Sequence, residues 1–152
     1  MRITDFLKEE RVLLDLNATS KEEAIKEIAN VLKNSEEVVD FDLFLKEIFD
    51  RESLSTTGIG NYIGIPHART DAVNRFVIAF GRSSNGIEFN SVDGKPAKLI
   101  FLMGTPKEKG LNSYLEILAH LTRLLNKKEL QEVLLNATSP KDIIEAFKNV
   151  EH

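Results

Sequence analysis

Two short apolar runs most constrain the fold of this chain. Residues 76–80 read FVIAF and residues 99–103 read LIFLM, without a polar side chain in either run. A strand with one face in water alternates apolar and polar residues, whereas a central strand covered on both faces is apolar throughout. The two runs therefore predict a sheet with further elements packed on both sides.

Helical patterns lie before and after these strands. Ser20 and Glu23 have the spacing of a capping box, and Asp40 is placed to cap a second helix that we expect to end near Arg51. Further helices are expected from about residue 112 to 125, over KKELQEVLL, and from Pro140 as a first helical position. We predict an α/β fold: a single-domain three-layer sandwich over residues 1–152, with a mixed β-sheet of about five strands flanked by helices.

Shorter signals complete the predicted sheet. VLLDL (12–16) and NYIGI (61–65) read as strands, the second one stopping at Pro66. Asn85-Gly86 and Asp93-Gly94 are hairpin-type turn pairs that flank IEFNSV.

Composition excludes several classes of function. The 152 residues are 42% hydrophobic and 29% charged, with a net charge of −4 and no basic stripe, which argues against nucleic acid as a partner. The chain has no Cys, and this excludes disulfides, Cys-ligated zinc and thiol chemistry. No apolar run is long enough for direct membrane insertion, and we expect a cytoplasmic protein.

The segment GIGNYIGIPHAR (58–69) is the strongest candidate for chemistry. Its glycine spacing is one residue off a dinucleotide fingerprint, and a Walker loop would need Gly-Lys-Ser/Thr, which is missing. His67, His120 and His152 are too dispersed to predict a metal site, and no serine lies on a nucleophile elbow. We expect neither a metal nor an organic cofactor.

His67 remains as the candidate nucleophile. Imidazole has an ordinary pKa of about 6.5, so its neutral form is abundant near pH 7 and a ring nitrogen can attack phosphorus and later leave. Pro66 fixes its own φ and favours an extended Ile65, which makes the approach to the ring stiff. The alternative is a half-buried histidine at a strand end, satisfied by a carbonyl group.

Donors for a phosphoryl group lie close by in the sequence. Gly58 and Gly60 allow backbone N–H groups to converge, Thr56 and Thr57 carry hydroxyls, and Arg51 can form a planar fork on phosphate oxygens. Arg69 and Arg75 are candidates for steering phosphate, with ordinary solvated charge as the alternative.

The segment from Arg51 to His67, RESLSTTGIGNYIGIPH, resembles the active-site segment of the phosphotransferase-system (PTS) enzyme IIA domains of type 2. This family comprises fructose, mannitol and nitrogen-regulatory members, and the similarity extends over most of the chain. It implies a phosphotransferase in which His67 accepts phosphate from the carrier protein HPr and passes it to a IIB component. It also implies that Arg51 neutralises the phosphoryl group.

The chain departs from the family at the second active-site histidine. A gapless alignment of YLEILAHLTRLL places Tyr114 there, and we interpret Tyr114 as a hydrogen-bond donor, with packing against the helix entry as the alternative. His120 is interpreted as a surface histidine within reach of Glu116, and His152 as part of a disordered terminus.

Three functions are compatible with the resemblance. The first is a phosphocarrier in sugar uptake, the second a regulatory protein whose phosphorylation state controls partner proteins, and the third a binding domain that has lost phosphate transfer. A carrier must expose one histidine to two proteins, so we expect a shallow site with an apolar rim formed by Ile59, Tyr62 and Ile63.

Overall fold

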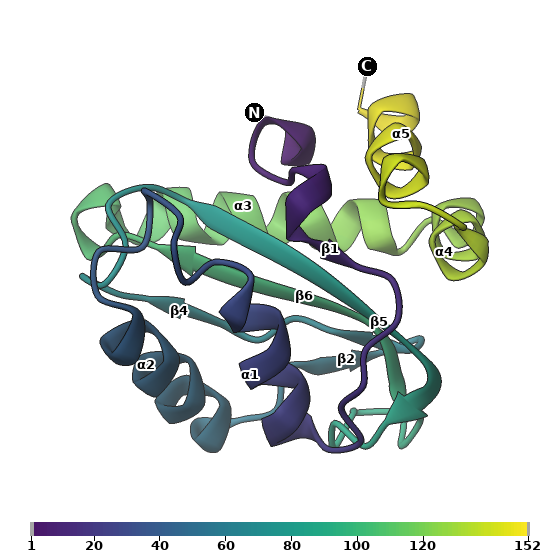
Figure 1. Cartoon of the computed structure of the whole chain (residues 1–152), viewed down its shortest axis with the longest axis horizontal. Coiled ribbons are helices and arrows are strands. Elements are labelled where there is room, and N and C mark those ends of the chain that lie inside the picture. Colours follow the sequence, from purple (N-terminus) through teal and green to yellow (C-terminus); the bar gives the residue numbers. More distant parts are fainter. Residues whose placement is uncertain (1, 152) are drawn as a thin grey trace.

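The computed structural model describes residues 2–151, except for the side chains of residues 109 and 110, and has the predicted three layers. Two helices cover one face of the sheet, and the other helices together with the N-terminal segment cover the opposite face (Figure 1). The helices are α1 (Lys21–Asn30), α2 (Phe41–Leu54), α3 (Gly110–Leu125), α4 (Lys128–Asn136) and α5 (Pro140–Val150), with 3-10 turns η1 (Ile3–Asp5), η2 (Glu9–Arg11) and η3 (Lys107–Lys109).

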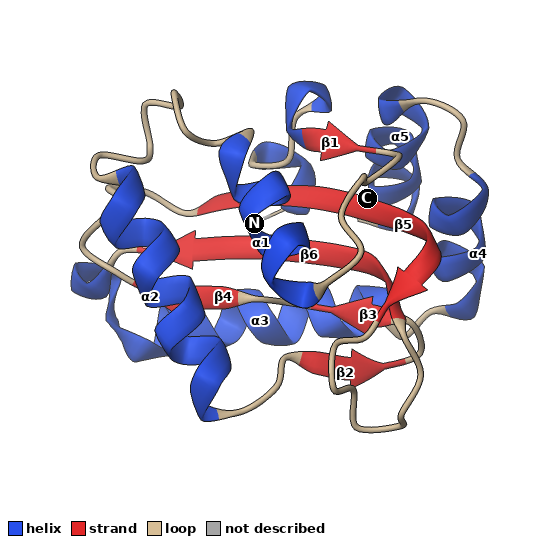
Figure 2. Ribbon diagram, turned by 60° about the horizontal axis from the view of Figure 1, so that its bottom comes forward, coloured by secondary structure: helices blue, strands red, loops and turns tan. Residues whose placement is uncertain are grey.

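The sheet is mixed, as predicted, and contains six strands where about five were expected. They are β1 (Val12–Leu13), β2 (Gly58–Gly60), β3 (Ile63–Gly64), β4 (His67–Arg69), β5 (Val77–Ile87) and β6 (Ala97–Thr105). The order is β1-β5-β6-β3-β2, and β4 also pairs with β6. The strands β3 and β4 are both parallel to β6 and lie end to end beside it (Figure 2).

The predicted caps are present. The Ser20 hydroxyl accepts from the Glu23 N–H at 3.2 Å, and the Asp40 carboxylate accepts from the Leu43 N–H at 3.1 Å. Pro140 lies in the first turn of α5. The helix α2 continues past Arg51 to Leu54, which leaves Arg51 in its last turn.

Side chains of alternate residues along β6 enter two separate cores. Phe101 and Met103 pack on the side of α3, α4 and α5, whereas Ile100 and Leu102 pack on the side of α1 and α2. This alternation explains the unbroken apolar run, because both faces of β6 are covered.

One predicted turn is wrong. Asn85-Gly86 lies inside β5 rather than in a hairpin, and the β5–β6 register shifts between Arg82 and Ile87. Gly86 has a φ of +82°, which is typical of a glycine at an irregularity of this kind. The connection to β6 is the segment 88–96, in which the Gly94 N–H donates to the Ser91 carbonyl at 3.0 Å.

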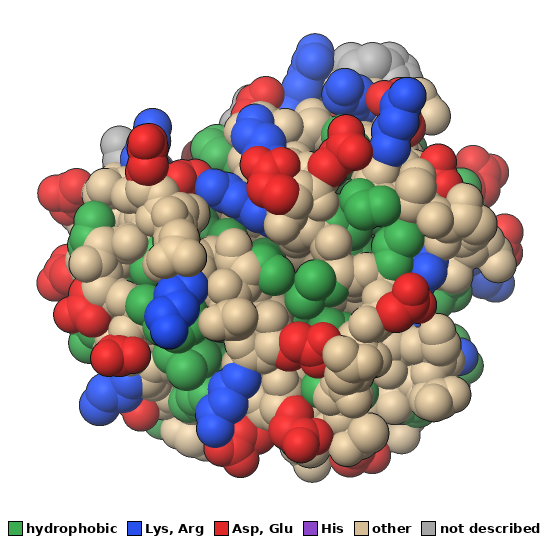
Figure 3. Space-filling model, in the orientation of Figure 1, with side chains coloured by type: hydrophobic (Ala, Val, Ile, Leu, Met, Phe, Trp, Pro, Cys, Tyr) green, Lys and Arg blue, Asp and Glu red, His purple; other side chains and the backbone are tan. Residues whose placement is uncertain are grey.

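The exterior seen in Figure 3 mixes both signs of charge. Lys and Arg side chains alternate with Asp and Glu over this face, and neither sign forms a continuous stripe on it. Among residues 2–151, no helix combines the length and the apolar character that a membrane span requires.

Candidate active site

His67 is the first residue of β4 and pairs in register with Met103 of β6. Adjacent residues in register point to the same face, so the imidazole lies on the α3 side of the sheet, as Met103 does. Ala68 packs on the opposite side, toward α2. The His67 residue is 7% exposed, so the ring is held by its surroundings with a small area open to solvent.

A backbone carbonyl fixes the orientation of this ring. His67 Nδ1 lies 2.6 Å from the carbonyl oxygen of Ile65. A carbonyl oxygen accepts but cannot donate, so Nδ1 carries the hydrogen in the neutral ring and Nε2 keeps its lone pair. The stiff Ile65-Pro66 segment therefore determines the tautomer as well as the position of the ring, which was not foreseen from the sequence.

The electrostatic environment keeps the ring neutral. Burial is the largest effect and lowers the pKa of His67 below its ordinary value of 6.5. The hydrogen bond that Nδ1 donates to the Ile65 carbonyl opposes this shift, and the nearby Arg51 charge adds to it. The neutral form is the one that attacks an electrophile, so the site favours a nucleophilic imidazole.

Tyr114, from α3, lies beside the imidazole. The two ring centroids are 5.5 Å apart, with a tilt of 51° between the ring planes. Burial raises the pKa of the Tyr114 hydroxyl. The charge and hydrogen bond of Arg51 and the charge of Arg69 lower it by smaller amounts. The phenol stays protonated around neutral pH and is available as a donor.

Two arginines line a cavity of about 490 Å³ that also borders Tyr114. We call it the His67 cavity because Ala68, Arg69 and Tyr114 of its lining adjoin His67, which is not itself a lining residue. Arg51 Nη1 donates to the Ser55 carbonyl at 3.0 Å, and Arg69 Nη2 donates to the Lys107 carbonyl at 2.9 Å. Arg69 Nε is buried without a hydrogen-bond partner among the described residues. The full lining is Glu47, Asp50, Arg51, Ser53, Leu54, Ala68, Arg69 and Tyr114.

The acidic side chains of this cavity already have partners. Asp50 pairs with Lys46 at 2.7 Å, and Glu47 accepts from the Thr70 hydroxyl at 2.6 Å. Neither of these two carboxylates is paired with Arg51 or Arg69, so the positive charge of the two arginines is available to an anion.

Glu52 organises the chain between α2 and β2, and its role was missed in the sequence. Its buried carboxylate accepts from the Thr57 N–H at 2.9 Å and from the Thr57 hydroxyl at 2.6 Å, and it pairs with Lys21 at 2.8 Å. This clasp ties the residue after Arg51 to α1 and to the loop that follows α2. In the Arg-Glu pair of the motif, Arg51 lines the cavity and Glu52 holds the neighbouring loop in place.

The hydroxyl- and glycine-rich segment does not converge on His67. Thr56 donates its hydroxyl to the Phe89 carbonyl at 2.6 Å and accepts from the Gly58 N–H at 3.0 Å, while both donors of Thr57 are directed at Glu52. Gly60, with a φ of +95°, lies beside Asp93. A phosphate-binding role for these four residues remains a prediction, and it requires the hydrogen bonds of Thr56, Thr57 and Gly58 to be exchanged.

The expected apolar rim is wrong in its residues. Ile63 is fully buried, Ile59 packs against the core, and the Tyr62 carbonyl accepts from Lys98 and Leu99 at the other end of β6. Exposed apolar side chains occur instead at the cavity and on the first turns of α3: Leu54 at 81%, Leu111 at 53% and Leu115 at 49%.

His120 has a different partner from the one expected. Its Nε2 lies 2.6 Å from the Glu151 carboxylate, which also accepts from the Ile3 N–H at 2.8 Å, so this pair links α3 to both ends of the chain. Glu116 is exposed, and His152 lies outside the described residues. In the same part of the chain, no group of three or more His, Cys, Asp or Glu side chains is arranged to hold a metal ion.

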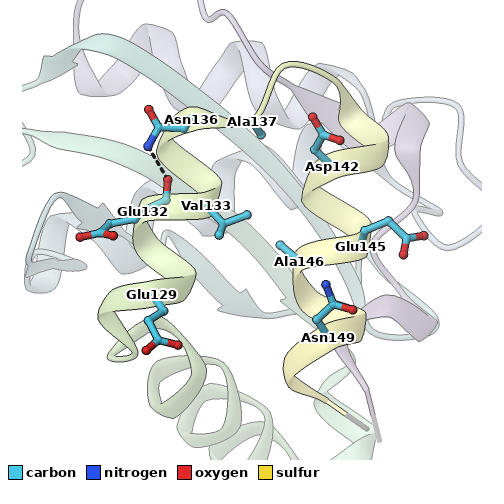
Figure 4. Close-up of a pocket in the computed structure, with 9 residues that line it drawn as sticks. All are labelled: Glu129, Glu132, Val133, Asn136, Ala137, Asp142, Glu145, Ala146 and Asn149. Carbon is cyan, nitrogen blue, oxygen red and sulfur yellow. Dashed lines mark hydrogen bonds between the residues drawn. The ribbon is translucent and has the colours of Figure 1, made fainter.

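A second hollow, of about 600 Å³, lies between α4 and α5 (Figure 4). Four carboxylate side chains line it: Glu129, Glu132, Asp142 and Glu145. Negative charge of this density repels a phosphoryl group. The His67 cavity is therefore the better candidate for anion chemistry.

Comparison with known proteins identifies the family of this chain. Residues 5–150 match the family described as phosphoenolpyruvate-dependent sugar phosphotransferase system, EIIA 2. The chain is 38% identical over 141 residues to the PTS fructose-specific EIIA component of Haloferax volcanii, covering 93% of this chain and 91% of that protein. It is 39% identical over 145 residues to the PTS fructose-specific EIIABC component of Bacillus subtilis, covering 95% of this chain but only 23% of that longer protein.

A solved structure is also similar over nearly the full length. The nitrogen regulatory protein IIA-Ntr of Neisseria meningitidis has a TM-score of 0.88 and 29% identity, with 95% of this chain and 98% of that chain covered.

Proposed function

The chain belongs to the type 2 EIIA family of the phosphoenolpyruvate-dependent sugar phosphotransferase system, and we propose that His67 is the residue that carries the phosphoryl group. Components of this family are phosphotransferases that pass phosphate through a histidine, and the chain is one of them. The observation that carries the residue assignment is the 2.6 Å contact between His67 Nδ1 and the Ile65 carbonyl, which leaves Nε2 as the nucleophile.

The reaction follows from this tautomer. The Nε2 lone pair attacks the phosphorus of the donor phosphohistidine, the P–Nε2 bond forms, and the donor P–N bond breaks with its electron pair returning to the donor ring. The Nδ1 hydrogen stays on His67, so the ring becomes positively charged as the bond forms. The Ile65 carbonyl accepts from Nδ1 and stabilises this charge.

Charge on the incoming group is offset by the two arginines. A phosphoryl group brings nearly two negative charges, and Arg51 and Arg69 contribute two positive charges at the His67 cavity. Arg69, which sequence analysis left between steering and ordinary solvated charge, lies two residues after His67 on the same face of β4. Its buried and unpartnered Nε supports a role in binding the phosphoryl group.

Protein partners have an exposed surface beside the cavity. Leu54, which lines the cavity, and Leu111 and Leu115, which lie on the same helix as Tyr114, are exposed apolar side chains, which is an arrangement suited to transient protein docking. We assign HPr as the phosphoryl donor, a IIB component as the acceptor, and the cytoplasm as the compartment. The whole chain, 1–152, then acts as one EIIA domain.

A regulatory role is the second candidate. It is favoured by the likeness to IIA-Ntr, a nitrogen regulatory protein, over nearly the whole chain. In this case the phosphorylated and unphosphorylated forms bind different regulatory partners, and the chemistry at His67 is unchanged.

Reconstitution tests the proposal. Purified protein is incubated with enzyme I, HPr and phosphoenolpyruvate, and candidate IIB components are then added. Wild type should gain an acid-labile phosphate and pass it on, His67→Gln should gain none, and His120→Gln, the matched control, should behave as wild type. Phosphate on His67→Gln would refute the assignment, and transfer to no IIB component would favour the regulatory role.

A further inference from the structure

Another pocket borders Tyr114 and is separate from both the His67 cavity and the hollow between α4 and α5. Its volume is about 300 Å³, at the lower end of the range for pockets that bind small organic molecules. Phe6, Phe76, Pro106 and Ile117 supply an apolar lining. Phe6 and Phe76 meet edge to face, with centroids 4.7 Å apart, and form one wall. We call this cavity the Thr105 pocket.

Thr105 gives the pocket a polar group in its interior. It is the last residue of β6 and only 3% exposed, and its side chain lies on the same face as Phe101 and Met103, toward α3. The Thr105 hydroxyl oxygen has no hydrogen-bond partner among the described residues. Leaving a buried hydroxyl without a partner costs about 1–3 kcal/mol, so a group entering the pocket is favoured if it satisfies this oxygen.

Arg75 provides a cation for the same pocket. Its side chain is 64% exposed, and the Glu36 carboxylate, itself 92% exposed, lies 3.9 Å away, beyond hydrogen-bond distance. Two other acids line a neighbouring cavity with Arg75: Glu37, which is held by Arg11 at 2.7 Å, and Asp5, which accepts from the Arg2 N–H at 3.1 Å. Exposed pairs of this kind are weak, so the Arg75 guanidinium remains available to a carboxylate that also buries an apolar body.

We propose that the Thr105 pocket binds a small hydroxyaryl-alkanoic acid. The aromatic ring occupies the apolar lining, the carboxylate pairs with Arg75 at the exposed end, and the aryl hydroxyl hydrogen-bonds Thr105 at the buried end. The pocket offers the Arg75 charge at its exposed end and the Thr105 hydroxyl at its buried end, with the hydroxyls of Ser113 and Tyr114 also in its lining. This arrangement suits a molecule with a carboxylate and a hydroxyl on either side of a ring.

Occupancy of this pocket should influence the phosphorylation site. Tyr114 lines both the Thr105 pocket and the His67 cavity, so a ligand on one side restricts the ring that faces the other. This coupling rests on the proposed role of His67, whereas ligand binding itself does not.

Binding is tested by amide NMR titration with two probes, 3-(4-hydroxyphenyl)propionate and 3-phenylpropionate. For wild type, we expect saturable shifts around the pocket and a preference of about fivefold for the hydroxylated probe, the usual gain from one hydrogen bond. Thr105→Val should abolish that preference while still binding 3-phenylpropionate. Arg75→Gln should weaken the binding of both probes by about threefold. Arg123→Gln, which removes an exposed arginine of α3 that does not line the pocket, should leave the binding unchanged.

The outcomes separate the two parts of the inference. No saturable binding to wild type, or equal binding of the hydroxylated probe to wild type and Thr105→Val, would overturn the assignment of the pocket. If the probe binds as expected, transfer from phosphorylated HPr is then measured with and without it. A transfer rate that changes with the probe in wild type, and needs about threefold more probe for the same change in Arg75→Gln, supports the coupling, and an unchanged wild-type rate overturns the coupling alone.

Discussion

Replacing Arg51 tests how the site handles the charge of a phosphoryl group. Arg51 lies in the last turn of α2, lines the His67 cavity and uses Nη1 to bind the Ser55 carbonyl at 3.0 Å. Its guanidinium also hydrogen-bonds Tyr114, and we expect it to contact phosphate oxygens in the cavity. A charge-assisted hydrogen bond contributes about 1.5–3 kcal/mol. At about 1.4 kcal/mol per decade, Arg51→Ala should slow phosphoryl transfer roughly 10- to 150-fold.

The same substitution should change the titration of His67. The Arg51 charge lowers the pKa of His67, so its removal should raise that pKa, while burial continues to hold it down. Arg51→Lys keeps a charge but loses the planar fork, and it should transfer more slowly than wild type with a smaller change in the His67 titration.

Rapid-quench transfer from phosphorylated HPr gives the rate, and NMR titration of the His67 ring gives the pKa. Urea unfolding serves as the stability control, because the lost contact with Ser55 is exposed and should cost under about 1 kcal/mol. Arg123→Ala is the matched control for removal of an exposed arginine. A wild-type transfer rate in Arg51→Ala, with an unchanged His67 titration, would refute the reasoning.

Three further predictions address neighbouring groups. Tyr114→Phe keeps the ring and removes the donor, so phosphohistidine hydrolysis should accelerate; an unchanged hydrolysis rate would leave the hydroxyl without a role. Glu52→Ala leaves both donors of Thr57 without an acceptor and should lower the free energy of unfolding in urea by about 3–5 kcal/mol. Asp50→Ala, which removes an exposed carboxylate, should lower it by under about 1 kcal/mol, and equal losses would contradict the structural role of Glu52. Because burial lowers the pKa of His67, phosphate acceptance should persist below pH 6.5 and fall only as the pH drops through that lowered value. As the pH falls from 6.5 through the lowered pKa, wild type should also lose stability relative to His67→Gln, because the unfolded chain binds the proton more readily. Loss of acceptance above pH 6.5 would contradict the shift.

The layers of the fold could be predicted because they depend on local signals. The apolar runs of β5 and β6 required cover on both faces, and Ser20 and Asp40 have the hydroxyl and carboxylate that helix starts favour. Asn85-Gly86 was misassigned because the same glycine conformation suits a hairpin turn and an irregularity within a long strand.

Three residues of the candidate site could be predicted because the sequence around them resembles a known family pattern. His67, Arg51 and Tyr114 were nominated from the sequence, and the structure brings them together at the edge formed by β4, α2 and α3. The partners of the hydroxyl groups could not be predicted, because Thr56 binds a carbonyl more than thirty residues away and Thr57 binds Glu52. Such pairings depend on how the elements pack and leave no local pattern.

Long-range contacts also explain the remaining differences. His120 has Glu116 four residues before it on the same helix, yet it binds Glu151, which α5 brings alongside α3. The apolar rim was expected beside His67 in sequence, whereas the exposed leucines are Leu54, which lines the cavity, and Leu111 and Leu115 in the first turns of α3.

The position of the phosphoryl group on the ring tests the central claim most directly. Protein labelled with ¹⁵N at histidine is phosphorylated with enzyme I, HPr and phosphoenolpyruvate, and its nitrogen–phosphorus couplings are recorded by NMR. The Ile65 carbonyl holds the hydrogen on Nδ1, so the account predicts phosphorus bonded to His67 Nε2 with Nδ1 still protonated. Phosphorus bonded to Nδ1 of His67, or to any nitrogen of His120, would contradict it.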